Sequence, residues 1–371
     1  MPTIVIYNPL CGDRTAKTFF DEHVLPLFAK ASTPISSIMN TERVGHAGEL
    51  AQNELEKSGE TLTIVLGAGD GTLHEIINHL SNAELKGARI GGPPTQIHLV
   101  LVPCGTANAL YASLFPPKGG DSSSVEYKLQ SVMSYLKGAD PRLVPLTLAI
   151  TTLSPPPAVA SSVVVSTSIH ASILHDSEAL RATIPGTERF KVAAKQNGTK
   201  WYNSHVKLLP VASLRVVQLY DPDTKSFINH PDADDNDPWP VIDIDEYHAF
   251  GGYVRCNDRS AVFRSYHFDG YSRAREAFAN KVWAILQGAY QDGAHVNLSY
   301  DDKGQITTEQ TDNPYAVEYI RCGGWEWIPD DLDDDAHLVC CDGAISTIEK
   351  GGRAVCVAAT PDKNAGFLVH V

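Results

Sequence analysis

The sequence predicts two domains: an α/β domain whose parallel sheet carries helices on both faces, followed by a mainly antiparallel β-sandwich domain. First, 371 residues exceed the size that a single hydrophobic core usually serves. Second, apolar strand-like runs alternate with helical stretches up to residue 141, which is typical of a covered parallel sheet. Third, the runs from residue 142 onwards are rich in Val, Thr and Ser, which favours antiparallel strands. We therefore expect domains at residues 1–141 and 142–371.

Four parallel strands are expected in the first domain. They lie at residues 3–7, 35–39, 62–66 and 97–102, and the accompanying helices at 14–30, 46–58, 72–80 and 107–115. Pro26 is expected to kink or shorten the first helix. Because ligands of parallel sheets collect at the carboxyl ends of the strands, the turns that follow these strands are expected to form one rim.

The second domain is expected to consist mainly of strands. Strand-like runs lie at residues 143–153, 159–169, 211–220, 249–256, 295–300, 315–321, 337–341 and 354–359. Short helices are expected at 176–182 and 273–287, and a long polar loop at 221–240.

The most informative turn lies within residues 63–80. An apolar run leads into Gly67, Gly69 and Gly71, with Asp70 among them, and a helix is expected to begin near Thr72. Glycines allow the backbone to approach a phosphate, and the free N–H groups of a helix start point towards it. The stretch has neither the Gly-Lys-Ser/Thr of a Walker A loop nor a spaced G-x-G-x-x-G. An acid beside a phosphate has either a metal or proton-transfer task or the structural task of a helix N-cap, and both readings stay open for Asp70.

Two further small-residue turns follow neighbouring strands. The first contains Asn8, Pro9 and Gly12, and the second runs from Pro103 through Gly105 and Thr106 to Asn108. Three such turns at three strand ends are much stronger evidence for a nucleotide site than any one of them.

Composition and charge disfavour several classes of protein. The net charge of −14 argues against a nucleic-acid binder, and the acidic runs at 232–237 and 330–335 are interpreted as solvated loops. Seven cysteines without a C-x-x-C indicate neither a disulfide framework nor a zinc site. The N-terminus enters a strand at once, and no apolar run approaches the roughly 20 residues of a membrane span. We therefore expect a cytoplasmic protein without a signal peptide.

Taken in order, the motifs resemble those of the lipid kinases of the diacylglycerol kinase catalytic-domain superfamily, above all the sphingosine kinase and ceramide kinase branch. In the first domain they are Asn8-Pro9 with Gly12, Thr41-Glu42-Arg43 before His46-Ala47, Gly69 to Thr72 with His74-Glu75 and Asn78, and Pro103 to Ala109. In the second domain they are Ser177 to Arg181, Arg189-Phe190 and Asp342-Gly343. This resemblance implies a first domain similar to NAD kinases and phosphofructokinases.

The resemblance also implies ATP- and Mg²⁺-dependent phosphorylation of a hydroxyl of a sphingoid base, ceramide or diacylglycerol. Asp70 would accept the hydroxyl proton or hold Mg²⁺ through water, and Glu75 would orient it unless it is a plain first-turn residue. No direct metal ligand is assigned. The implied nucleotide-binding residues are Asn8, Pro9, Gly12, Thr41, Gly67, Gly69, Gly71, Thr72, Gly105, Thr106, Asn108, Arg181, Arg189, Asp342 and Gly343. A structural cap for Asn108 and a surface role for the two arginines remain alternatives.

Two departures from the branch pattern bear on the substrate. Ser172 stands where the branch carries an Asp that contacts the lipid head group, and Ala344 stands where a Glu usually follows Asp-Gly. An amine-bearing lipid would lose a charged hydrogen bond of roughly 1.5–3 kcal/mol at Ser172. A catalytically weakened regulatory protein that binds nucleotide or lipid is therefore one alternative function. A kinase of a soluble metabolite, as in NAD kinases, is the other.

Contact with a membrane would be peripheral. The locally basic segment 181–207, with Trp201 and Tyr202, is the candidate face, and an ordinary solvated surface is the alternative. The apolar residues of the second domain either line a lipid cavity or form an ordinary hydrophobic core. Both alternatives give the same sequence periodicity. Oligomeric state is left open.

Overall fold

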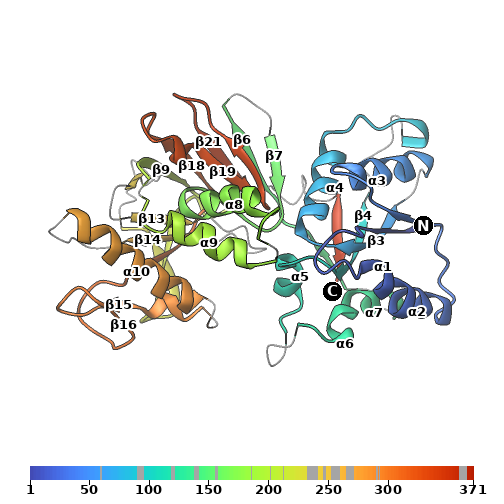
Figure 1. Cartoon of the computed structure of the whole chain (residues 1–371), viewed down its shortest axis with the longest axis horizontal. Coiled ribbons are helices and arrows are strands. Elements are labelled where there is room, and N and C mark those ends of the chain that lie inside the picture. Colours follow the sequence, from blue (N-terminus) through green and yellow to red (C-terminus); the bar gives the residue numbers. More distant parts are fainter. Residues whose placement is uncertain are drawn as a thin grey trace. The chain divides into compact units, whose positions relative to one another are not determined.

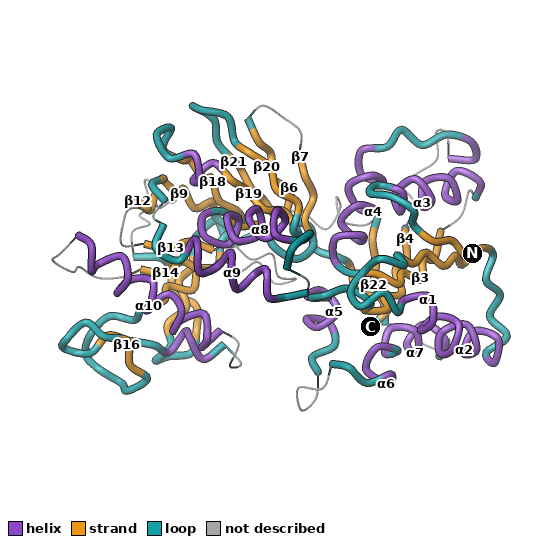
Figure 2. Tube along the Cα trace, in the orientation of Figure 1, coloured by secondary structure: helices purple, strands orange, loops and turns teal. Residues whose placement is uncertain are grey.

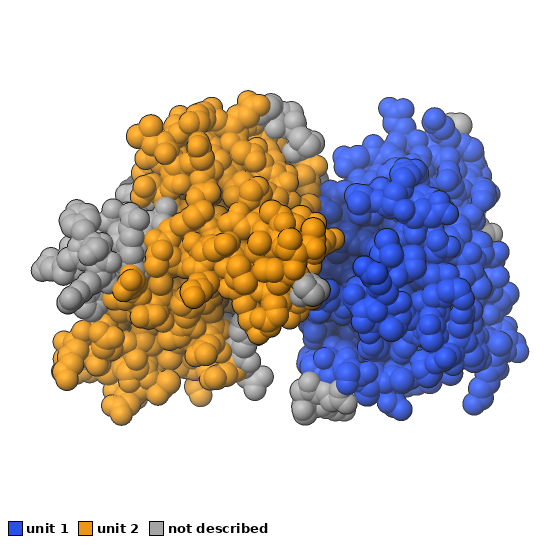
Figure 3. Space-filling view, in the orientation of Figure 1, with its two compact units in different colours: residues 1–148, 359–371 blue, residues 149–358 orange. Residues whose placement is uncertain are grey.

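A computed structural model of the chain divides into two compact units, Met1–Leu148 with Ala359–Val371 (unit 1) and Ala149–Ala358 (unit 2) (Figure 3). The residues that the structure describes are 1–58, 61–89, 96–117, 122–137, 142–154, 158–184, 186–200, 202–211, 213–231, 241–244, 248–251, 260–264, 271–289, 291, 293–358 and 366–371. Unit 1 departs from the expected boundary at residue 142 because it extends to Leu148 and regains the C-terminal segment.

Unit 1 is built on a six-stranded sheet in the order β2-β1-β3-β4-β22-β5. Its strands are β1 (Thr3–Tyr7), β2 (Ser37–Asn40), β3 (Leu62–Ala68), β4 (Ile97–Pro103), β22 (Phe367–His370) and β5 (Leu143–Pro145). All neighbours pair in parallel except β5, which is antiparallel to β22. The parallel sheet and its four expected strands are thus confirmed, with ends shifted by up to two residues.

Helices cover both faces of this sheet (Figure 1), as the complete burial of β3 and β4 requires. One face is covered by α3 (His46–Lys57) and α4 (Asp70–Asn82). The other is covered by α1 (Ala16–Phe19), η1 (Phe20–Val24), α2 (Leu25–Lys30), α6 (Val125–Lys128) and α7 (Gln130–Leu136). A 3-10 turn, η2 (Gly87–Arg89), and a short helix, α5 (Ala109–Leu114), complete the unit.

The first helix contains the irregularity expected from Pro26. The segment η1 is a π-helical turn between α1 and α2, and Pro26 lies in the first turn of α2. Proline has no N–H to donate and its ring crowds the carbonyl four residues earlier, so the wider turn before it relieves the clash. Phe20 and Phe28 from this helix are buried in the core of unit 1.

The C-terminal strand β22 was not expected from the sequence. It follows unit 2 in the chain and lies between β4 and β5 in the sheet of unit 1, where Figure 1 shows it in red beside the blue strands. Four residues carry too short a pattern for sequence-based assignment, and the pairing depends on contacts across most of the chain length.

Unit 2 is mainly antiparallel, as expected. Its sheets are β12-β9-β18-β21-β6-β7, β11-β10-β17-β14-β13, β20-β19-β8 and β15-β16. The strand bounds are β6 Ala149–Leu153, β7 Ala158–Ser161, β8 Val165–Ser166, β9 Ser204–Leu209, β10 Gln218–Asp221, β11 Ser226–Asn229, β12 Val241–Ile244, β13 His248–Gly251, β14 Ser260–Arg264, β15 Ser299–Tyr300, β16 Ile306–Thr307, β17 Val317–Arg321, β18 Gly324–Pro329, β19 Leu338–Cys341, β20 Ala344–Thr347 and β21 Ala354–Ala358. Residues of β6, β8, β9, β17, β18, β19 and β21 share one buried core, and the two-layer sandwich stays a prediction.

In the described part of unit 2, the helices that accompany these sheets (Figure 2) are α8 (Ser168–Leu180), α9 (Glu188–Asn197) and α10 (Tyr271–Ala289). The helix α8 begins eight residues earlier than the expected 176–182, so the end of the predicted strand 159–169 belongs to it. Two 3-10 turns, η4 (Ala294–Asn297) and η5 (Asp334–His337), precede β15 and β19. The acidic run 232–237 and Trp201 lie outside the described residues. Among the residues that the structure describes, none of the helices combines the length and the apolar character that a membrane span needs.

Candidate active site

The structure brings together the three small-residue turns that the sequence singled out. A Cβ on Gly12 would fall against the carbonyl oxygen of Cys104, so the first and third turns touch through their backbones. A Cβ on Gly69 would lie 3.0 Å from the Cα of Gly105, so the second and third turns do the same. Gly12 also has a φ of +52°, which favours glycine. Close approach of backbone to backbone therefore explains why these positions are glycines.

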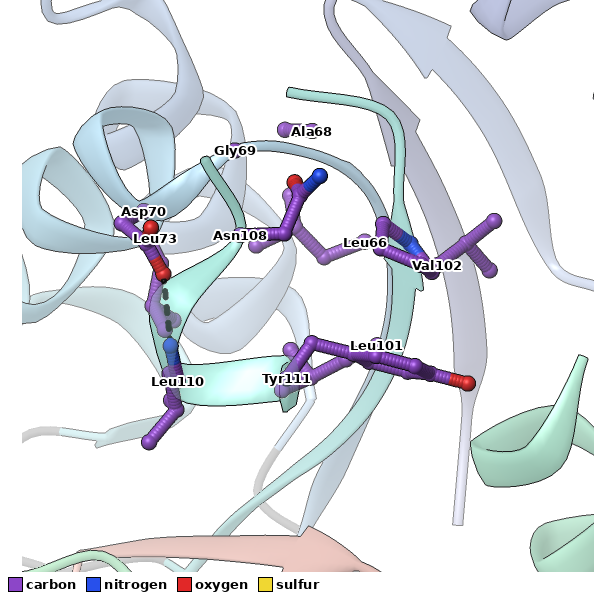
Figure 4. Close-up of a pocket in the computed structure, with 11 residues that line it drawn as sticks. Leu66, Ala68, Gly69, Asp70, Leu73, Leu101, Val102, Asn108, Leu110 and Tyr111 are labelled. Carbon is purple, nitrogen blue, oxygen red and sulfur yellow. Dashed lines mark hydrogen bonds between the residues drawn. The ribbon is translucent and has the colours of Figure 1, made fainter. Parts of the chain in front are cut away.

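Asp70 connects the second turn to the third. It is the first residue of α4, and its carboxylate accepts hydrogen bonds from the backbone N–H groups of Ala109 (2.7 Å) and Leu110 (3.1 Å). Figure 4 shows Asp70 directed at Leu110, the start of α5. The structural reading of Asp70 as a capping carboxylate thus has direct support, although the helix that it caps is α5 rather than its own. Each carboxylate oxygen keeps further acceptor capacity for a ligand.

Asn108 shapes the third turn from within. Its backbone is left-handed (φ 53°, ψ 45°), and its side-chain amide accepts from the Gly105 N–H and donates to the Gly105 carbonyl, each at 2.8 Å. Asn is one of the few residues that adopts this conformation readily. Asn108 occupies the N-cap position of α5, but its side chain makes no cap hydrogen bond to that helix and bonds the backbone of Gly105 instead. Its contact with nucleotide stays a prediction.

The remaining residues of the turns divide into buried and open positions. Asn8 donates from Nδ2 to the Thr72 hydroxyl at 3.2 Å, and Thr72 is buried. Gly67 packs against the ring of Phe20, so it has a structural reason to be glycine. Gly71, by contrast, has no atom within 4 Å of where a Cβ would stand, and Thr106 is exposed. The last two are the positions with free space beside them.

Thr41 and Glu75 lie behind the turns. Thr41 is buried, and its N–H donates to the carbonyl of Tyr7 at the end of β1 (3.0 Å). Glu75 is half-buried in α4, and burial raises its pKa, while a hydrogen bond from the backbone of Gly45 acts in the opposite direction. Glu75 therefore holds the turn before α3, and its proposed action on Asp70 stays a prediction.

A pocket opens beside Asp70 (Figure 4). It is lined by Leu66, Ala68, Gly69, Asp70, Leu73, Leu101, Val102, Pro103, Asn108, Leu110 and Tyr111. The lining is apolar apart from the side chains of Asp70, Asn108 and Tyr111, and it comes from β3, β4 and the helices α4 and α5 that follow them. No group of three or more His, Cys, Asp or Glu side chains suited to a metal occurs among the described residues.

The predicted site residues of unit 2 have contacts of their own. Arg181 pairs with Glu178 (Nη2 to Oε2, 3.1 Å) and is well exposed, and the Arg189 guanidinium lies 4.6 Å from the Phe190 ring centroid. The buried carboxylate of Asp342 accepts from the backbone N–H groups of residues 162, 163 and 164 at 2.7–2.9 Å. Gly343 follows with a φ of +95°. Asp342 thus organises a loop of unit 2.

Ser172 is buried in α8, only 1% exposed. Its hydroxyl has no hydrogen-bond partner within 3.5 Å among the residues that the structure describes, and the same holds for the neighbouring phenol of Tyr202. Burial raises the pKa of Tyr202, so the phenol is neutral. Ala344 is exposed in β20. Two adjacent neutral hydroxyls therefore stand where the branch pattern has a carboxylate.

Sequence reasoning missed three groups that the geometry makes important. The backbone N–H groups of Ala109 and Leu110 fix Asp70. Nearly every residue type has such a group, so the sequence does not show which of them act as donors. Tyr202 was noted only as a surface aromatic, whereas it is buried beside Ser172. A sequence motif contains only the residues that form it. The groups that contact those residues from elsewhere in the chain are found only in the folded structure.

Comparison with known proteins finds a family to which part of the first unit is similar. Residues 2–135 match the family model of the diacylglycerol kinase catalytic domain. Human sphingosine kinase 1 is 37% identical over 111 residues, which are 30% of this chain and 27% of that protein. The mitochondrial acylglycerol kinase of Xenopus laevis is 28% identical over 134 residues, 36% of this chain and 28% of that protein. The chain thus matches about a quarter of the length of these curated relatives.

The fold is similar to a solved structure of a putative diacylglycerol kinase from Bacillus anthracis str. Sterne, with a TM-score of 0.50. The superposition covers 100% of this chain and 96% of the Bacillus anthracis chain. Its sequence identity of 13% limits that likeness to the fold. The parallel sheet and the turns at its edge define unit 1 as an α/β domain of the kind that carries phosphate sites. Residues 2–135 are thus similar to the diacylglycerol kinase catalytic domain, and the curated relatives that match this region include sphingosine kinase 1 and an acylglycerol kinase.

Proposed function

We propose that this protein is a lipid kinase that transfers the γ-phosphate of ATP, with Mg²⁺, to a hydroxyl of a sphingoid base, ceramide or diacylglycerol. The observation that carries the proposal is the meeting of three glycine turns at the ends of β1, β3 and β4 around the carboxylate of Asp70. Phosphoryl transfer depends on positioning and on charge stabilisation more than on covalent chemistry, and such a rim supplies both.

The turns bind and orient ATP in this proposal. Backbone N–H groups near Gly71 and Thr106, the positions with open space, face the phosphates. The contacts between Gly69 and Gly105 fix the distance between the two turns, so the phosphate site is built before the nucleotide arrives. A preformed site of this kind avoids the cost of ordering the loops on binding.

Asp70 orients the lipid hydroxyl and takes its proton. The N–H groups of Ala109 and Leu110 fix the carboxylate but use only part of its acceptor capacity. The remaining lone pairs accept a hydrogen bond from the attacking hydroxyl, which is the task of a general base in phosphoryl transfer. The neighbouring apolar wall of Leu73, Leu101 and Leu110 excludes water from that hydrogen bond.

The donor set fits Mg²⁺ in one particular mode. Asp70 is a single carboxylate, and the described residues form no cluster of three metal-ligating side chains. Mg²⁺ commonly binds through one or two carboxylates, several waters and the phosphates of its substrate. Asp70 would therefore hold it through water, together with the nucleotide, and the ion would neutralise charge on the phosphates.

The head-group side of the substrate is assigned to Ser172. A neutral hydroxyl favours an uncharged head group over an amine, which a carboxylate would bind more tightly. Because Ser172 is buried beside Tyr202, lipid binding requires the residues that cover it to move apart. Arg181 and Arg189 are proposed as nucleotide contacts, and peripheral association with a membrane delivers the lipid.

The test is phosphate transfer from labelled ATP to a panel of a sphingoid base, ceramide, diacylglycerol and NAD. We expect transfer to at least one lipid and a loss of about 100-fold or more in Asp70→Asn, the usual scale for removing a general base. Asp21→Asn is the matched control, because its exposed carboxylate pairs with Lys17 on the surface. Transfer to NAD alone would refute the lipid assignment.

The same assay separates catalysis from loop organisation. Asp70→Asn loses one acceptor for the N–H groups of α5, so its melting temperature and ATP affinity are measured alongside its turnover. Retained ATP binding with lost transfer supports the catalytic role. Absence of any transfer by the parent protein, despite stabilisation by ATP, would favour the regulatory protein that Ser172 and Ala344 suggest.

A further inference from the structure

Tyr111 is a buried residue of α5 to which the proposed function gives no task. It is the third residue of that helix, and its side chain is 3% exposed. It follows Ala109 and Leu110, whose backbone N–H groups donate to the Asp70 carboxylate. Because the three residues share one helical turn, whatever fixes the Tyr111 side chain also fixes the two donors on Asp70.

The phenol of Tyr111 is anchored outside α5. Its hydroxyl donates to the backbone carbonyl of Tyr127, the third residue of α6, at 2.6 Å in a buried site. Burial raises the pKa of Tyr111, while the backbone N–H groups of Gln130 and Ser131 act on that pKa in the opposite direction. The phenol is therefore neutral and keeps the proton that it donates, and its oxygen lies at the start of α7.

Aromatic packing surrounds this hydrogen bond. The Tyr111 ring meets the Tyr127 ring edge to face, with centroids 5.3 Å apart, and lies 4.7 Å from the ring of Phe115 at the end of α5. Tyr127 and Phe115 are themselves buried. A phenylalanine at position 111 would keep the ring in this packing and remove the hydroxyl alone.

The helix α7, beside which the phenol lies, is bonded to the sheet of unit 1. The backbone N–H of Leu101 in β4 donates to the Ser131 hydroxyl at 3.0 Å, and that hydroxyl donates to the His370 carbonyl of β22 at 2.7 Å. Since β4 is buried along its whole length, this end of the connection belongs to the close-packed interior. Tyr111 thus ties a short helix at the rim to the interior of unit 1.

The helix α5 needs such a tie because it is only six residues long. A helix of this length has little stability of its own in water. If its first turn shifted, the bonds of 2.7 and 3.1 Å to Asp70 would weaken steeply with misalignment. A catalytic group must be held to within about 0.5 Å of its productive position, so the order of α5 bears directly on Asp70.

On the basis of the function proposed above for Asp70, we propose that Tyr111 is a positioning residue for this general base. Its hydroxyl holds α5 against the turn between α6 and α7, and α5 in turn holds its two N–H donors on the carboxylate. Figure 4 shows the Tyr111 hydroxyl pointing away from Asp70. Tyr111 therefore acts through the helix and not on the reacting atoms.

The test compares Tyr111→Phe with Tyr135→Phe in the full-length chain. Tyr135 of α7 shares a hydrogen bond of 2.8 Å with Thr3 of β1, so the control loses a phenol hydroxyl from the same unit at a bond to another element. Hydrogen exchange followed by NMR measures the N–H groups of Ala109 and Leu110. We expect both to exchange about tenfold faster in Tyr111→Phe, the scale of one lost hydrogen bond, and at the parent rate in Tyr135→Phe.

Kinetics provide the second readout. With a lipid that the parent phosphorylates, Tyr111→Phe should lower kcat about tenfold or more and leave the KM for ATP within about twofold, because a displaced base slows transfer while the glycine turns still bind nucleotide. Tyr135→Phe should keep the parent kcat. Melting temperatures of both variants are measured alongside, and the assays are run well below them, so a purely structural role of Tyr111 would leave kcat unchanged.

Three results would overturn the proposal. The first is unchanged exchange of Ala109 and Leu110 in Tyr111→Phe, and the second is an equal loss of kcat in Tyr135→Phe. The third is fast exchange of these two N–H groups in the parent chain, a measurement that stays decisive even if Tyr111→Phe fails to fold. A parent chain that transfers no phosphate refutes the proposed function, whereas an active parent with an unaffected Tyr111→Phe variant refutes the positioning role alone.

Discussion

Acidic side chains at both Asp-Gly motifs bind backbone amides. Asp70 accepts from two N–H groups and Asp342 from three. A carboxylate held in this way is fixed in position, which a general base needs and which a loop also needs for its own order. What separates the two residues is their surroundings: Asp70 borders a pocket, whereas Asp342 is buried.

Asp342→Asn tests whether that buried carboxylate is structural. The amide would remove a charged acceptor from three N–H groups and bring an NH₂ towards them, so we expect unit 2 to lose about 2–3 kcal/mol of stability. Urea denaturation followed by tryptophan fluorescence measures this change. Asp312→Asn, at an exposed position, is the control. Unchanged stability combined with weaker ATP binding would instead support the nucleotide contact that the motif implies.

At the scale of elements, the glycines of the turns separate into two kinds. A Cβ on Gly105 would fall against the Cα of Gly69 and within 2.9 Å of the Asn108 Oδ1, whereas a Cβ on Gly71 meets nothing within 4 Å. Gly105 is thus required by the contact between turns. Gly71 lies in the first turn of α4, where alanine is intrinsically better by up to about 1 kcal/mol.

Alanine substitution should distinguish these two kinds of glycine. Gly105→Ala forces two backbones apart, so we expect a lower melting temperature together with weaker ATP binding. Gly71→Ala should fold at least as well as the parent and still raise the ATP concentration needed for half-saturation about fivefold or more, because a methyl group would occupy the proposed phosphate space. Thermal melts with and without ATP measure both effects. Normal ATP binding in Gly71→Ala would remove this residue from the phosphate site.

Local patterns predicted the elements that position the site, and long-range contacts account for what they missed. The strand at 62–66 and the turn after it can be predicted because the apolar run of a buried strand and the glycines of a turn follow each other directly in the sequence. The same holds for the kink at Pro26. The capping of α5 by Asp70 and the proximity of Ser172 to Tyr202 bring together residues that are distant in sequence, so no local pattern predicts them. Predicted contacts of Arg181 and Arg189 with nucleotide remain predictions.

At the scale of the whole molecule, the sheet of unit 1 is completed by the end of the chain. The family match stops at residue 135, yet β22 separates β4 from β5 in the observed order. β4 also leads directly into the third glycine turn. The domain that the motifs define is therefore shorter in sequence than the unit that folds.

A chain that ends at residue 365 should show this dependence. It loses the buried side chains of Phe367 and Val369, worth about 2 kcal/mol each, along with the pairing of β4 and β5 to β22. For a unit of this size, such a loss lowers the melting temperature by about 10 °C or more. We expect the truncated chain to lose stabilisation by ATP as well, because β4 carries the third turn.

Tryptophan position provides the internal control for that truncation. All five tryptophans lie between residues 201 and 327, within unit 2, so their fluorescence follows that unit alone. Circular dichroism should reveal an early transition for unit 1, while the tryptophan transition keeps its parent midpoint. Coincident early melting by both probes would mean that the units unfold together, and an unshifted melt by circular dichroism would mean that unit 1 is stable without β22. Only the separated transitions agree with a nucleotide sheet that depends on its last strand.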